Sequence, residues 1–85
     1  MNYFTQVWDE ERDDEYASWG TSTWYFETNH TDLVLKQITV YQNGKTVKYT
    51  EEKQEDEFGG LCEGPLTIDD CDGEIISKED FYLLW

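Results

Sequence analysis

The sequence has little positive charge. Its 85 residues contain 6 Lys and Arg against 20 Asp and Glu, which gives a formal net charge of -14 at pH 7. The phosphates of nucleic acid and the headgroups of anionic lipids would be repelled by such a chain. The charge balance therefore argues against direct binding to nucleic acid or to an anionic membrane surface. It favours a basic protein partner, a cation, or solubility alone.

Long apolar runs are also missing. No segment approaches the roughly 20 apolar residues that a membrane-spanning helix needs. The N-terminal stretch MNYFTQVWDEE contains neither the basic region nor the apolar region of a secretory signal. We therefore expect a cytoplasmic location, where cysteines are most often thiols. Cys62 and Cys71 are interpreted in this way, and a disulfide closing the short loop between them is the alternative.

Histidine and cysteine are too few for the common catalytic and metal-binding arrangements. The single histidine, His30, lies in a polar turn with no local sign of a paired nucleophile and orienting group. Cys62 and Cys71 do not form a C-x-x-C pair. With 20 acids, carboxylate pairs arise by chance, and so small a domain leaves little room for a substrate cleft. We predict that the protein is not an enzyme and has no catalytic residues, metal site or cofactor.

One acidic segment, DDCDGEIISKE, partly resembles a calcium-binding EF-hand loop. With Gly73 at the sixth position, Asp70 and Asp72 occupy the third and fifth. However, Ile68 then falls at the first position, where a carboxylate is needed, and the preceding GGLCEGPLT cannot form the entering helix. A cation-binding module using Asp69, Asp70 and Asp72 stays open as an alternative function.

Aromatic residues, in contrast, are plentiful and make up 16% of the chain. Large rings bury roughly 150–250 Å² each, whereas disordered acidic segments contain few of them. The composition therefore predicts one folded domain over residues 1–85.

The strand signals lie in the first 50 residues. β-favouring residues predict strands at roughly 2–8 and 23–28. The segment LVLKQITVYQNGKTVKYT predicts a hairpin of strands 33–42 and 45–50, because Asn43-Gly44 is typical of a two-residue type I′ turn. This register places four apolar residues on one face of the sheet: Ile38, Val40, Val47 and Tyr49. It places Thr39 and Lys48 on the other.

The segment ISKEDFYLLW predicts a short C-terminal helix. Ser77 is a suitable N-cap, with Asp80 three residues later. Phe81, Leu84 and Trp85 fall on one helical face, which must pack on the sheet because so short a helix is unstable alone. We therefore predict an α+β fold: an antiparallel sheet of about four strands with a central Asn-Gly hairpin and this helix packed on one face.

Three connecting segments, at 9–15, 51–57 and 69–74, carry 15 of the 20 acids. The excess is larger than the roughly 2–8 charges that solubility requires, and loops are common sites of recognition. We predict that two of these segments bind a partner, although solvation alone could also explain the charge. The predicted partner-binding acids are Asp9, Glu10, Glu11, Asp13, Asp14, Glu15, Glu51, Glu52, Glu55, Asp56 and Glu57.

Trp19 lies within the first acidic connection rather than in a strand. Aromatic residues beside charge often anchor protein interfaces, so Trp19 completes the predicted binding residues. The alternative is a ring folded back over the edge of the sheet. Trp8, Trp24 and Trp85 are predicted to belong to the core.

The order of these motifs resembles a family of small acidic bacterial single-domain proteins of unknown function. The matching segments are Val7-Trp8, the hairpin residues 36–44, and residues 76–81 with Trp85. Family members usually carry a proline in the acidic stretch and an arginine before the hairpin lysine, and this chain has neither. The family is similar in size and charge to the immunity proteins that neutralise polymorphic bacterial toxins. No catalytic residues can be carried over from it.

The sequence thus predicts a non-enzymatic binding protein, an immunity protein that covers the active surface of a basic toxin domain such as a nuclease. A nuclease needs a basic surface for its phosphate-bearing substrate, and an acidic protein can occupy that surface. The alternatives are a nucleic-acid mimic that inhibits a DNA-binding protein, and the small cation-binding module.

Overall fold

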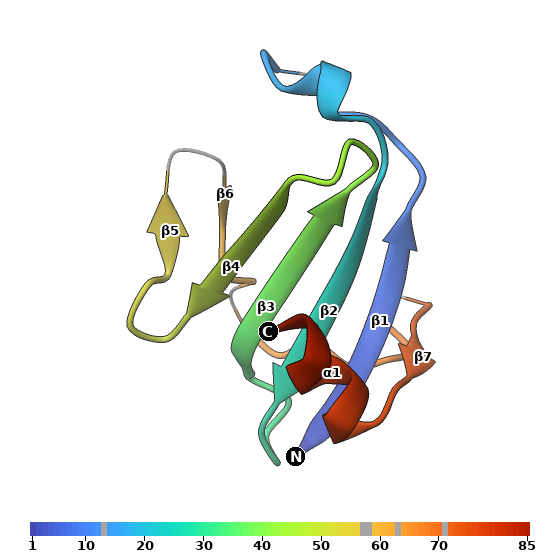
Figure 1. The fold of residues 1–85 in the computed structure, drawn as a ribbon. Coiled ribbons are helices and arrows are strands. Elements are labelled where there is room, and N and C mark those ends of the chain that lie inside the picture. The colour runs from blue at the N-terminus through green and yellow to red at the C-terminus, as the bar shows by residue number, and fades with distance from the viewer. Residues whose placement is uncertain (13, 57–58, 63, 71) are drawn as a thin grey trace.

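The chain forms an antiparallel five-stranded sheet with one short helix (Figure 1). The computed structural model describes residues 1–12, 14–56, 59–62, 64–70 and 72–85. The sheet order is β4-β3-β2-β1-β7. Its strands are β1 (Asn2–Trp8), β2 (Ser22–Thr28), β3 (Val34–Tyr41), β4 (Thr46–Thr50) and β7 (Glu74–Ile75).

The remaining elements are short. A separate hairpin joins β5 (Glu55–Asp56) to β6 (Gly59–Gly60), a 3-10 turn η1 spans Ala17–Trp19, and helix α1 spans Lys78–Leu84. The predicted α+β class, the four long strands and the C-terminal helix are confirmed. Strands β5, β6 and β7 were not predicted, because two-residue strands carry no periodic signal.

The central hairpin is confirmed, but its predicted register is wrong by one residue. Tyr41 pairs with Lys45 through a 2.8 Å bond from the Tyr41 amide to the Lys45 carbonyl, so the loop has three residues instead of two. Gly44 has a φ of +92°, the left-handed conformation that ends a three-residue hairpin loop. Val47 therefore lies opposite Thr39 rather than Val40.

This shift exchanges the faces of β4 relative to β3, because neighbouring strand residues point to opposite sides. Val47 and Tyr49 share a face with Gln37 and Thr39, while Ile38 lies on the other face, opposite Lys48. The predicted common face of Ile38, Val40, Val47 and Tyr49 is thus corrected.

The front face of the sheet is the side covered by α1 (Figure 1). Ser77 is confirmed as the N-cap, since its Oγ accepts a 3.0 Å hydrogen bond from the Asp80 amide. Phe81 is fully buried, with its ring centroid 5.5 Å from that of Tyr3 on β1, and the Trp85 ring stacks on it. Leu84 is partly exposed. One aromatic side chain thus forms the centre of the helix–sheet contact.

The back face is covered by the irregular segment after β6. Leu61, Leu66 and Ile68 of that segment pack on a buried cluster formed by Phe4, Phe26 and Val34. A second cluster, of Tyr41, Val47 and Tyr49, lies near the start of β4. Most of the apolar core is therefore held under a cover that has little regular secondary structure.

The tryptophans predicted for the core divide into two groups. Trp24 packs on the Phe4 cluster and Trp85 on Phe81, and both are half-buried. Trp8 is 47% exposed. It ends β1 beyond Phe4 and Thr5, the last residues that pair with β7, so the prediction of a core position for Trp8 is wrong.

Within the described residues, no helix is long and apolar enough to cross a membrane.

Candidate partner-binding surface

The first acidic segment, residues 9–15, connects β1 to β2 at the Trp8 end of the sheet. Its acids Asp9, Glu10, Glu11, Asp14 and Glu15 are exposed. Asp13 lies outside the described residues. The carboxylates of the described acids face solvent, and their binding to a partner stays a prediction.

Arg12 holds this segment against the sheet. Its guanidinium forms a 2.6 Å ion pair with Asp14 and donates a 3.0 Å hydrogen bond to the Tyr41 hydroxyl. It also lies 5.1 Å from the centre of the Tyr16 ring. The hydrogen bonds from Arg12 lower the pKa of the Asp14 carboxyl. Asp14 is therefore engaged within the molecule although its side chain is exposed.

Trp19 completes this aromatic group. Its half-buried ring packs edge-on against Tyr41 at 5.0 Å, and the Lys45 ammonium lies 5.7 Å from the ring centre. The ring is thus folded over the end of the sheet, the alternative that the sequence left open. Its contact with a partner stays a prediction.

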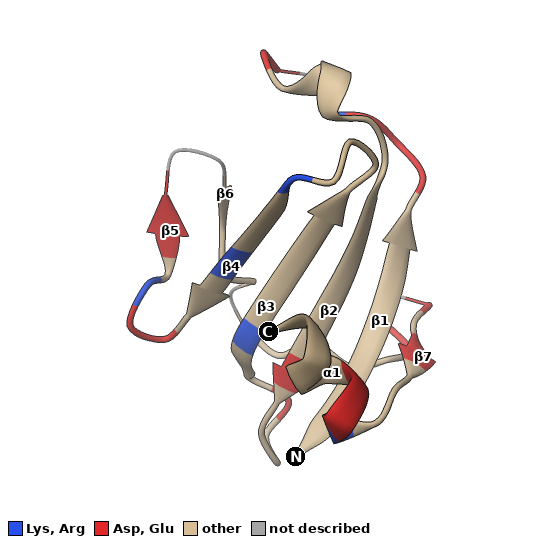
Figure 2. Cartoon of the chain, viewed as in Figure 1, with Lys and Arg blue, Asp and Glu red and all other residues tan. Residues whose placement is uncertain are grey.

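The second acidic segment, residues 51–57, begins at the opposite end of the sheet, after Thr50 of β4. Glu51, Glu52 and Glu55 are exposed, whereas Asp56 is half-buried. Glu57 lies outside the described residues. The two predicted binding segments start from opposite ends of the sheet, and Figure 2 shows their acids on separate parts of the molecule.

Asp56 links the second segment to the sheet. Its carboxylate accepts a 2.8 Å hydrogen bond from the Tyr49 hydroxyl and lies 3.8 Å from the Lys53 ammonium. Burial raises the pKa of Tyr49, and the hydrogen bond to Asp56 raises it further. Like Asp14, Asp56 thus has its carboxylate engaged within the molecule.

The third acidic segment, residues 69–74, leads into β7. Asp69, Asp70 and Asp72 are exposed, while Cys71 lies outside the described residues. The Asp70 carboxylate accepts a 3.1 Å hydrogen bond from the Thr67 amide. Among the described residues, no three His, Cys, Asp or Glu side chains are grouped so that they could hold a metal ion.

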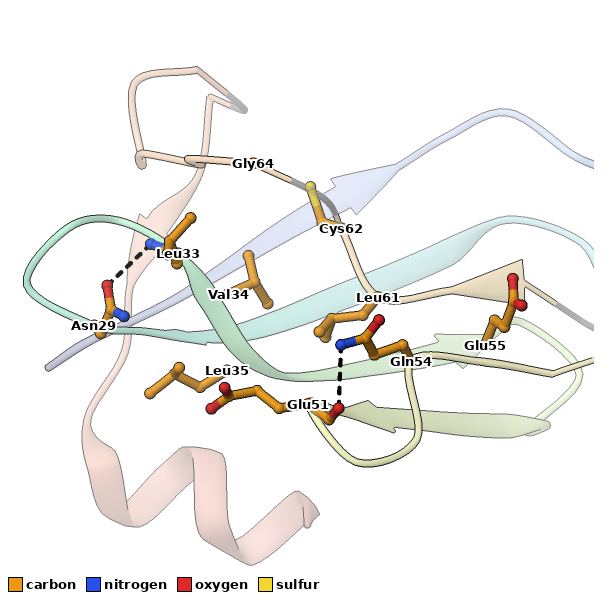
Figure 3. A pocket seen from close by; sticks show the side chains of 10 residues that line it. All are labelled: Asn29, Leu33, Val34, Leu35, Glu51, Gln54, Glu55, Leu61, Cys62 and Gly64. Atoms are coloured by element: carbon orange, nitrogen blue, oxygen red, sulfur yellow. Dashed lines mark hydrogen bonds between the residues drawn. The ribbon is translucent and has the colours of Figure 1, made fainter.

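A pocket of about 470 Å³ lies beside the start of β3 (Figure 3). We call it the β3 pocket. Three segments supply its walls. They are residues 29–35, which form the turn before β3 and its first two residues, the 51–55 segment, and the segment after β6. Its lining residues are Asn29, Leu33, Val34, Leu35, Glu51, Gln54, Glu55, Leu61, Cys62 and Gly64. Two of the predicted binding acids, Glu51 and Glu55, therefore lie at a cavity.

The pocket exists because β3 extends past β4. Pairing between the two strands stops at Lys36 and Thr50, so the first two residues of β3, Val34 and Leu35, have no β4 partner. The chain turns away after Thr50, where the Thr50 and Lys53 amides each donate to the other residue's carbonyl at 3.0–3.1 Å. Sequence reasoning missed this pocket because its walls meet only through the sheet register.

Glu27 is a buried acid that sequence reasoning also missed. It is 3% exposed, and its carboxylate accepts hydrogen bonds from the hydroxyls of Tyr3, at 2.8 Å, and of Tyr82. Lys36 lies directly opposite on β3 and donates to the Tyr82 hydroxyl at 3.0 Å. These contacts join α1 to the front face and leave Glu27 without access to a ligand.

Comparison with protein-family models, curated proteins and solved structures finds no match for this chain. The resemblance to the small acidic bacterial family stays a prediction.

Proposed function

We propose that this chain is a non-enzymatic binding protein whose acidic surface covers a basic protein partner. The supporting observation is the imbalance between exposed acids and available cations. Between described residues, the ion pairs are Arg12–Asp14 and Lys53–Asp56. The exposed carboxylates of Glu10, Glu11 and Glu15 take part in neither pair, so their charge faces solvent and can meet a cationic surface.

The partner class that best fits is a toxin domain such as a nuclease, with this chain acting as a cytoplasmic immunity protein. A nuclease concentrates Lys and Arg where its substrate's phosphates bind. Carboxylates placed on that surface would block substrate by occupying it. The resemblance to small acidic bacterial proteins supports the same class.

The nucleic-acid mimic is a weaker proposal. A mimic needs carboxylates in rows that follow phosphate spacing, about 1.7 Å of duplex axis per charge. The first two acidic segments leave opposite ends of the sheet (Figure 2), which favours a partner that contacts separate charged patches.

The test starts by capturing the partner from lysate of the source organism on the immobilised chain and identifying it by mass spectrometry. Association with the purified partner is then measured by stopped flow from about 0.05 to 0.5 M salt. We expect the association rate to fall steeply, since salt screens exposed charges. A flat response would contradict the proposal, as would turnover of a substrate by the chain alone.

The variant for this test replaces Glu10, Glu11 and Glu15 together by Gln. It leaves Arg12 and Asp14 intact, so we expect an unchanged fold and an association rate lowered about tenfold or more at low salt. The matched control replaces Asp69, Asp72 and Glu74 by their amides, which removes the same charge from the third segment. Equal losses in the two variants would indicate that net charge alone matters.

A further inference from the structure

We propose that the β3 pocket is a receptor for an arginine or lysine side chain of the basic partner. This inference rests on the proposed function and assigns a place to one of its contacts. The pocket is lined by aliphatic side chains, which we call the floor, and by the carboxylates of Glu51 and Glu55, which we call the rim; Figure 3 shows Glu51 beside Leu35 and Glu55 beyond Gln54. A long basic side chain has the same two parts, an apolar stem and a charged head.

The floor is formed by aliphatic side chains of two segments. Leu33 directly precedes β3, Val34 and Leu35 begin it, and Leu61 comes from the segment after β6. Leu33 is 42% exposed, although it stands beside the buried Val34. Covering such an exposed leucine with the methylene groups of a ligand would be favourable, by about 25 cal/mol per Å² of apolar surface removed from water.

The rim supplies negative charge. The carboxylates of Glu51 and Glu55 come from the 51–55 segment, and neither is paired with any described residue. The nearest basic residue in sequence, Lys53, is directed to Asp56 at 3.8 Å. Unpaired carboxylates beside an apolar floor select a cationic group over a neutral or anionic one.

The wall is held in place from beneath by Gln37. Its Nε2 donates a 3.0 Å hydrogen bond to the Gly60 carbonyl, and its Oε1 accepts a 2.8 Å bond from the Cys62 amide. Gln37 is fully buried. Because both bonds go to the backbone on either side of Leu61, the position of that wall does not depend on the ligand.

The probe for this inference is a nona-arginine peptide, with nona-citrulline as a neutral control of nearly the same shape. Binding to the 15N-labelled chain is followed by NMR at 0.05 and 0.15 M salt. We expect the amide signals of Leu35, Leu61, Cys62 and Gly64 to move with nona-arginine and to stay unchanged with nona-citrulline. Unmoved pocket signals with a bound peptide would overturn the assignment.

Two charge-matched double variants sharpen the test. Glu51→Gln with Glu55→Gln removes the rim, and Glu10→Gln with Glu11→Gln removes the same charge elsewhere. We expect the first to weaken nona-arginine binding about five- to tenfold and the second about twofold, since exposed ion pairs contribute roughly 0.2–1 kcal/mol each. Equal weakening would overturn the pocket while leaving the proposed acidic surface intact.

The floor is tested by Leu33→Ser against Leu83→Ser. Leu83 is 84% exposed on α1 and does not line the pocket. We expect about threefold weaker binding for Leu33→Ser and no change for Leu83→Ser, and equal affinities would overturn the role of the floor. If the unmodified chain fails to bind nona-arginine at any salt concentration, the proposed function itself fails first.

Discussion

The two faces of the sheet are covered in different ways. On the front face, α1 is held by Phe81 and by the Tyr82 hydroxyl, which donates to the buried carboxylate of Glu27. On the back face, the irregular segment after β6 is held by the buried amide of Gln37, which bonds to its backbone at Gly60 and Cys62. Each face thus buries one polar side chain that fastens its cover.

The difference follows from the backbone hydrogen-bonding groups of each cover, which need partners when they are buried. Helix α1 pairs part of its backbone within itself, since the Phe81 and Trp85 amides donate to the Ser77 and Phe81 carbonyls. The Ser77 hydroxyl also caps the Asp80 amide. An irregular segment cannot do this, and each backbone group that it buries needs a partner from elsewhere. Gln37 supplies one donor and one acceptor, which is the combination that a neutral amide offers and a carboxylate does not.

The two covers also differ in what lies beside them. The segment after β6 carries one wall of the β3 pocket and ends in the third acidic segment, whereas α1 packs on the sheet through Phe81. A loop can place side chains around a cavity when a rigid scaffold fixes its backbone. The two hydrogen bonds of Gln37 fix the backbone of this segment to the sheet.

The largest expected effect is that of Gln37→Leu. The substitution keeps a similar volume but leaves the Gly60 carbonyl and the Cys62 amide without their partners. Each lost partner in a buried site costs about 1–3 kcal/mol, so we expect the free energy of unfolding to fall by about 3 kcal/mol. Urea denaturation followed by tryptophan fluorescence measures it.

The control for Gln37→Leu is Gln54→Leu. Gln54 is exposed and donates one 3.2 Å bond, to the Glu51 carbonyl, so its loss should cost less than about 0.5 kcal/mol. Similar costs for the two variants would mean that the back cover is held by its apolar contacts and not by Gln37.

A smaller effect is expected for Glu27→Gln on the front face. The amide can still accept a hydrogen bond, but it loses the charge that strengthens the bonds from Tyr3 and Tyr82. We expect a loss of about 2 kcal/mol in the free energy of unfolding. The control, Glu79→Gln, changes an exposed acid in the first turn of α1. A stabilised Glu27→Gln variant would indicate that burial of the charge outweighs its bonds.

The sequence predicted the parts of this comparison that depend on local signals. The helix start at Ser77 and the burial of Phe81 follow from capping and spacing, and the hairpin follows from Asn43-Gly44. Its register could not be predicted in the same way. Asn-Gly suits both two- and three-residue loops, and the Asn43 side chain accepts a bond from the Lys45 amide in the loop that forms.

The candidate site was predicted as a set of exposed acids together with Trp19. Exposure of Glu10, Glu51 and Glu55 follows from their polarity. The structural contacts of the two aspartates do not: Asp14 pairs with Arg12, which also donates to the distant Tyr41, and Asp56 bonds to Tyr49, seven residues earlier. Gln37 and Glu27 lie among strand residues whose faces only the register decides. The β3 pocket depends on the same register, and local sequence patterns therefore could not reveal it.

The smallest expected effect concerns a tyrosine–carboxylate hydrogen bond that occurs once on each face of the sheet. Tyr3 donates to Glu27 on the front face and Tyr49 donates to Asp56 on the back, each at 2.8 Å. Burial is the first cause that raises the pKa of both phenols, and the neighbouring carboxylates raise it further. A raised pKa means that the folded state favours the protonated phenol. This stability is fully present below about pH 10, the value of an unfolded tyrosine, and is lost as pH rises above it.

Tyr3→Phe and Tyr49→Phe should therefore each lower the free energy of unfolding by about 1 kcal/mol at pH 7. Each variant should also lose less stability than the unmodified chain between pH 10 and 11. In the unmodified chain the unfolded state is favoured there by ionisation of this phenol, and phenylalanine cannot ionise. Urea denaturation across this range gives both quantities. The Tyr3→Phe loss should be the larger, since Glu27 is buried and Asp56 is only half-buried. If Tyr49→Phe lowers the free energy of unfolding more than Tyr3→Phe does, exposure of the carboxylate does not decide the strength of the bond. The Tyr49–Asp56 bond would then be a main attachment of residues 51–56 to the sheet.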